Sequence, residues 1–169
     1  MSRSTKRKNL RRIATVGVLT AAAFILSYLE AILPFSLGIP GVKLGLSHLV
    51  TVFALYRLTA WETVSITLVR VMLAAFLFGN TASLAYSLAG AVLSLAVMLL
   101  LRRLPVFSPT GVSVAGGICH NLGQLACAAL LMSTASLGWY LPVLLVAGCI
   151  SGAVIGIVGG ILIRRVPKA

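Results

Sequence analysis

The chain of 169 residues contains no aspartate, and Glu30 and Glu62 are its two acidic residues. Enzymes that act on diphosphates through Mg²⁺ hold the metal with clustered carboxylate oxygens, which two glutamates in separate segments do not provide. We therefore expect that the chain is not an enzyme and holds no metal. The phosphate-binding loop G-x-x-x-x-G-K-[ST] is also missing, so ATP binding by that route is excluded.

Cysteine is scarce as well, with Cys119, Cys127 and Cys149 all inside apolar stretches. No Cys-x-x-Cys spacing or extracellular cluster is present, so neither a disulfide framework nor a zinc site is indicated. We expect these residues to act in packing, and we predict no cofactor.

Apolar residues are abundant, because 60% of the chain is hydrophobic and 9% is charged. The mean hydropathy of +1.10 predicts an integral membrane protein. The net charge of +12 would suggest a nucleic-acid partner in a soluble protein. Here most basic residues lie at the ends of apolar runs, so the charge indicates membrane topology and no nucleic-acid binding.

Six apolar segments are long enough to cross a bilayer. They lie at about 12–33, 44–60, 62–79, 81–101, 111–133 and 139–163. Residues 1–11 form a basic tail; its charge order resembles a signal peptide, but the run that follows has membrane-spanning length and no A-x-A site. Thr59 and Glu62 match a capping box that would start the third helix. The sequence thus predicts an all-α bundle of six transmembrane helices in one domain, 1–169.

The basic residues also predict orientation. Twelve of the fourteen Lys and Arg residues fall on one side if the N-terminus is cytoplasmic, namely Arg3, Lys6, Arg7, Lys8, Arg11, Arg12, Arg57, Arg102, Arg103, Arg164, Arg165 and Lys168. Lys43 falls on the outer side and Arg70 lies within a helix. Both termini are therefore expected in the cytoplasm, in a multi-pass protein of the cell membrane.

Arg70 is the sharpest functional signal. Counted from Glu62 at about 1.5 Å per residue, it lies roughly 12 Å into the bilayer. A charge at that depth costs on the order of 3 kcal/mol, so it should face the bundle interior and meet a partner or a ligand. A structural ion pair with Glu30 is one interpretation. Participation in a binding pocket is the other.

The fifth predicted helix carries the run GGICHNLGQL. His120 and Gln124 share one helix face, with Asn121 beside it, and such side chains should point inward rather than to lipid. Hydrogen bonding between helices would explain them. His120 reaches about the same depth as Arg70, however, and this convergence favours a substrate-binding site.

The outer loop LPFSLGIPGVKLG breaks helical periodicity and resembles a lid. Lys43 ends this loop and His48 follows one turn into the second helix, so both should share a polar mouth with Glu30. Alternatively, Lys43 contacts membrane lipid headgroups, and His48 and Glu30 lie in the wet interface.

Small residues form two patterns along the helices. Gly148, Gly152, Gly156 and Gly160 recur at every fourth position, and Gly17 and Ala21 are a weaker version of the same spacing. Such ridges serve internal packing or the docking of another membrane subunit.

Two stretches carry a family resemblance: LEAILPFSLGIPGVKLGLSHLV at 29–50 and GVSVAGGICHNLGQL at 111–125. They resemble the Gx transporter family, labelled heptaprenyl diphosphate synthase component I, whose members are similar to the S components of energy-coupling-factor (ECF) transporters. Where that pattern has Ala-Asn after KLGL, this chain has Ser47 and His48.

The resemblance implies a six-helix, S-component-like fold with an outward-facing pocket beneath the first loop. It also implies partnership with a transmembrane coupling subunit and two ATPases, for which Ala14, Gly17 and Ala21 would form the docking face. We therefore expect a substrate-binding subunit of an ECF-type uptake transporter that captures a small vitamin- or precursor-like molecule. The alternative is a non-catalytic membrane partner in isoprenoid, quinone or electron-export metabolism.

Overall fold

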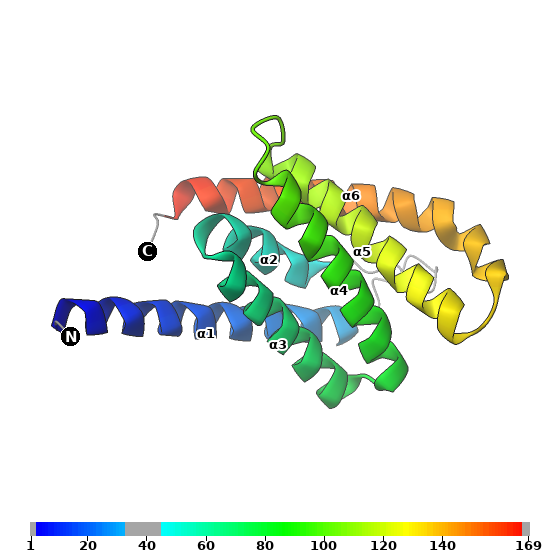
Figure 1. The fold of residues 1–169 in the computed structure, drawn as a ribbon, viewed down its shortest axis with the longest axis horizontal. Coiled ribbons are helices and arrows are strands. Elements are labelled where there is room, and N and C mark those ends of the chain that lie inside the picture. The colour runs from blue at the N-terminus through cyan, green and yellow to red at the C-terminus, as the bar shows by residue number, and fades with distance from the viewer. Residues whose placement is uncertain (1–2, 33–44, 167–169) are drawn as a thin grey trace.

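The computed structural model describes residues 3–32 and 45–166, which form helices joined by short turns (Figure 1). In chain order the elements are α1 (Arg3–Ile32), α2 (Leu46–Arg57), α3 (Ala60–Phe78), α4 (Thr81–Leu101), α5 (Pro109–Leu131), the 3-10 helix η1 (Ala135–Tyr140) and α6 (Leu141–Arg165). The six α-helices correspond to the six predicted segments. Five helices are long and apolar enough to cross a membrane, which confirms the predicted all-α membrane bundle.

Several helix ends differ from the sequence prediction. α1 begins at Arg3 rather than near residue 12, so the helix takes in most of the predicted basic tail. Lysine, arginine and leucine favour helix, and no proline interrupts this stretch. α5 begins at Pro109, because Ser108 accepts a hydrogen bond from the Gly111 N–H and proline suits the first helical position.

The second helix is shorter than the predicted segment 44–60. Its 12 residues rise about 18 Å, whereas the hydrocarbon core of a bilayer is about 30 Å thick. The helix starts after Gly45, whose φ of 71° is left-handed, and it ends at Leu58, whose backbone is extended. Thr59 and Glu62 then form the predicted capping box of α3. α2 therefore fills only part of the length of the bundle.

α2 lies between two hydrophobic clusters. One cluster joins α2 to α4, α5 and α6, through Val52, Leu55, Met98, Val112 and Ile155. The other joins α2 to α1 and α3, through Val50, Ala54, Ala23 and Ile66. Around α2, successive contacts run from α1 to α3, α4, α5 and α6, and from α6 back to α2. The short helix is thus held from both sides.

Charged helix ends gather at one end of the bundle, which we call the basic end. Arg12 of α1 forms a two-point ion pair with Glu62 of α3, with both N–O distances at 3.1 Å. Arg102, which follows α4, donates to the carbonyl of Leu55. α1 begins and α6 ends on the same side of the molecule (Figure 1). The opposite end is the one predicted to face outward.

Glycines let α5 approach both of its neighbours closely. A Cβ added to Gly123 would lie 2.7 Å from the carbonyl oxygen of Ala89 in α4, and one added to Gly152 would lie 2.7 Å from the Cα of Val114 in α5. Gly148 and Gly156 of the α6 ridge face α5 in the same way. Most of the predicted ridge therefore serves internal packing. Gly160 differs, because nothing lies within 4 Å of its added Cβ.

Candidate functional site

A cavity of about 360 Å³ lies in the half of the bundle away from the basic end, beyond the start of α2. All six α-helices contribute side chains to its wall, and the exposed residues Gly79 and Asn80 lie at its rim. Its volume falls within the range of small-molecule sites. The position follows from the short α2, since the centre of the bundle is filled by that helix only toward the basic end.

Six of the seven residues predicted to bind substrate line this cavity. They are Glu30, His48, Arg70, His120, Asn121 and Gln124. The seventh, Lys43, lies outside the described residues, as does the predicted lid at 33–44. The geometry therefore brings the predicted residues together, while their role in binding stays a prediction.

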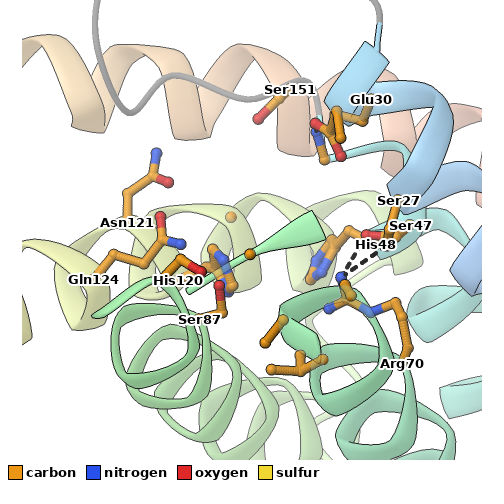
Figure 2. Close-up of a pocket in the computed structure, with 18 of the residues that line it drawn as sticks. Ser27, Glu30, Ser47, His48, Arg70, Ser87, His120, Asn121, Gln124 and Ser151 are labelled. Carbon is orange, nitrogen blue, oxygen red and sulfur yellow. Dashed lines mark hydrogen bonds between the residues drawn. The ribbon is translucent and has the colours of Figure 1, made fainter. Parts of the chain in front are cut away.

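Arg70 is held by neutral partners. Its Nη1 donates to Ser47 Oγ at 2.8 Å and to Ser27 Oγ at 3.2 Å (Figure 2). Its Nε is buried and has no hydrogen-bond partner in the described chain. Within residues 3–32 and 45–166 the salt bridge found is that of Arg12 with Glu62, so the structural ion pair considered between Glu30 and Arg70 is not formed. Among the described residues Arg70 therefore has no carboxylate within salt-bridge distance.

Glu30 is engaged elsewhere. Its carboxylate accepts a hydrogen bond from the backbone N–H of Gly45, the residue before α2. The first N–H groups of a helix lack intrahelical partners and carry partial positive charge, so a carboxylate is favourable there. Glu30 thus ties the end of α1 to the start of α2 at the cavity wall, which explains why it does not pair with Arg70.

The polar residues of α5 form the opposite part of the wall. Asn121 Nδ2 donates to the carbonyl oxygen of Leu144 in α6 at 2.7 Å, so the interhelical hydrogen bond considered from the sequence exists for this residue. A Cβ added to Gly90 of α4 would lie 2.8 Å from Gln124 Cγ and 3.0 Å from His120 Cε1. A glycine at position 90 therefore leaves room for both side chains.

Two polar groups face the cavity from different helices (Figure 2). One group consists of Arg70, His48, Ser27 and Ser47, and the other of His120, Asn121, Gln124 and Ser87. The Nε2 of His48 is buried without a hydrogen-bond partner among the described residues. A buried polar atom costs free energy unless it is bonded, so this atom and Arg70 Nε are two unsatisfied polar atoms among the residues that line the cavity.

Sequence reasoning missed the hydroxyl residues of the site. Ser27, Ser47, Ser83, Ser87 and Ser151 all line the cavity. Ser83 and Ser87 are four residues apart and therefore share a helix face, and Ser27 precedes Glu30 by one turn. This spacing was the available signal. Serine is common in membrane helices, so it did not stand out beside arginine and histidine.

The residues proposed for docking lie on the surface of α1. Ala14, Gly17 and Ala21 are exposed, and nothing lies within 4 Å of a Cβ added to Gly17. Their face of α1 is therefore not used for packing within the described chain. A partner or lipid could cover it without rearrangement of the bundle.

Comparisons with known proteins give one result. No curated protein and no solved structure matches the chain significantly. The family model described as heptaprenyl diphosphate synthase component I matches residues 19–162, which includes every α-helix in whole or in part. Because this match covers most of its length, the chain belongs to the heptaprenyl diphosphate synthase component I family.

Proposed function

We propose that this membrane protein is the substrate-binding subunit of an ECF-type uptake transporter and that it captures a small molecule bearing an anionic group. The observation that carries the proposal is the cavity of about 360 Å³ in which Arg70 is bonded to two serines and to no carboxylate of the described chain. A guanidinium binds carboxylate or phosphate oxygens strongly in such a setting. The amides of Asn121 and Gln124 would bind carbonyl or N–H groups elsewhere on the ligand.

The second candidate is a non-catalytic membrane partner of a prenyl diphosphate synthase, and the family name favours it. The lining of the cavity argues against storage of a prenyl chain there. Hydrocarbon would desolvate the charge of Arg70 and the polar groups of His48 and Gln124 without offering them hydrogen bonds, which is costly. We also propose that the chain itself is not catalytic, because Glu30 and Glu62 lie at opposite ends of the bundle and cannot converge on one Mg²⁺ ion.

Copurification distinguishes the two candidates. We expect the full-length tagged protein, extracted in mild detergent from the membrane of its native cell, to carry a coupling subunit and two ATPases. Gly17→Leu should release them, because it places a bulky side chain on the small-residue face of α1. Gly160→Leu is the matched control, since the added Cβ of both glycines meets open space.

The same preparations are used to identify the bound ligand. We expect a small molecule to be detected by mass spectrometry after denaturation of the wild-type protein and to be lost from Arg70→Ala. Recovery of a prenyl synthase or redox enzyme in place of the ATPases would contradict the transport proposal. An unchanged ligand content in Arg70→Ala would remove Arg70 from the site.

A further inference from the structure

A second cavity, of about 390 Å³, lies at the basic end of the bundle. It is formed where α1 passes the turn between α2 and α3, and its wall includes Arg12, Tyr56, Arg57, Thr59 and Glu62. The candidate functional site shares none of these residues. The second cavity is therefore a separate feature, and nothing in the proposed capture of a substrate uses it.

Arg57 is the unneutralised charge of this cavity. The carboxylate of Glu62 is taken up by Arg12 and by the backbone and side chain of Thr59. Arg102, the other arginine close to α2, donates to the carbonyl of Leu55. Arg57 makes no hydrogen bond or ion pair with the described chain. One full positive charge thus remains in the wall.

Two hydrogen-bond donors at the cavity are buried and unused. The Nε of Arg57 and the hydroxyl of Tyr56 are both inaccessible to solvent, and neither has a partner among residues 3–32 and 45–166. Buried donors in native proteins are nearly always satisfied by protein, water or ligand. An unpaired guanidinium and an unused hydroxyl in the wall of one cavity form a setting that favours an anion with several acceptor oxygens.

The cavity also lies at the level of a membrane surface. It is bounded by α1 and α3, which are both long and apolar enough to span a bilayer. Trp61, next to Glu62, is 81% exposed, and tryptophan is enriched at the headgroup level of membranes. Basic pockets between transmembrane helices on the cytoplasmic side bind anionic headgroups. A phosphate carried by a lipid fits this position better than one free in solution.

We propose that the basic-end cavity binds the phosphate group of an anionic phospholipid, with the Arg57 guanidinium as the cation and the Tyr56 hydroxyl as a second donor. Free phosphate has the same chemistry, and the test separates the two sources. The site does not rest on the proposed transport function. It would hold a lipid on the cytoplasmic side whether or not the outward cavity captures a substrate.

Native mass spectrometry of the full-length protein in a neutral detergent tests this proposal. Phosphatidylglycerol and phosphatidylcholine are titrated separately, and inorganic phosphate is added as a competitor. We expect phosphatidylglycerol to bind more tightly, and we expect Arg57→Gln to weaken its binding by about tenfold or more, the effect of losing a hydrogen bond to a charged group. Tyr56→Phe should weaken it by a smaller factor, because the ring still packs against the core cluster of α2.

Arg103→Gln is the matched control, since Arg103 is an exposed arginine that does not line the cavity. Equal losses in Arg57→Gln and Arg103→Gln would overturn the proposal, because general charge attraction would then explain the binding. Weaker lipid binding in Arg57→Gln, with unchanged binding in Arg103→Gln, supports the proposal. A smaller loss in Tyr56→Phe supports it without a change of charge. Competition by inorganic phosphate would assign the site to free phosphate and overturn the lipid assignment, as would the absence of any preference for phosphatidylglycerol.

Discussion

Replacement of Arg70 by methionine should separate a binding role from a structural one. The guanidinium makes two hydrogen bonds, at 2.8 and 3.2 Å, both from Nη1. At the low end of the range for charged donors these contribute about 1.5 kcal/mol each. Placing the charge at that depth costs on the order of 3 kcal/mol. The two terms nearly cancel, so we expect the ligand-free protein to change in stability by no more than about 1 kcal/mol.

Reversible unfolding in mixed micelles of a mild detergent and dodecyl sulfate, followed by circular dichroism, measures this difference. Arg103→Met serves as the control, because Arg103 is exposed at the turn after α4. A loss of more than about 3 kcal/mol in Arg70→Met would refute the reasoning. That result is expected when one partner of a buried ion pair is removed, and it would mean that Arg70 holds the bundle together.

Two further predictions concern packing and orientation. Gly123→Ala should destabilise the bundle by about 1–3 kcal/mol, because the new methyl group would lie 2.7 Å from a carbonyl oxygen of α4. Gly17→Ala should be neutral or stabilising by up to about 1 kcal/mol, because its methyl group would meet open space. Equal effects of the two variants in the same unfolding assay would contradict the close approach of α4 and α5. Ser87→Cys, in a chain whose native cysteines are replaced by alanine, should react with a membrane-impermeant maleimide added outside intact cells. Reaction only after the cells are opened would reverse the predicted orientation.

Hydropathy and charge predicted the six helices because each segment is long, apolar and flanked by basic or turn residues. The same reasoning found Arg70 and the α5 residues His120 and Gln124, since polar groups at that depth must face inward. The length of α2 was not predictable in this way. Its start is set by the left-handed backbone of Gly45, and its end by the extended backbone of Leu58, neither of which the apolar pattern reveals.

Contacts between distant segments were equally hidden from the sequence. The sequence left open a bond from Glu30 to Arg70, but the carboxylate binds the Gly45 N–H, whose position depends on the left-handed backbone before α2. Arg57 was interpreted as a marker of topology, as basic residues at helix ends usually are. The burial of its Nε depends on how α1 packs beside the turn that follows α2, which the sequence does not reveal.

Under the proposed uptake function, the short second helix has one further consequence for a molecule bound in the cavity. α2 occupies the bundle axis toward the basic end and is packed on both flanks, so within the described residues it blocks a straight passage along that axis. Delivery to the cell interior therefore requires either that α2 leave its packed position or that the whole bundle turn within the bilayer. The first route breaks two hydrophobic clusters, while the second keeps them intact and demands a partner that drives the rotation.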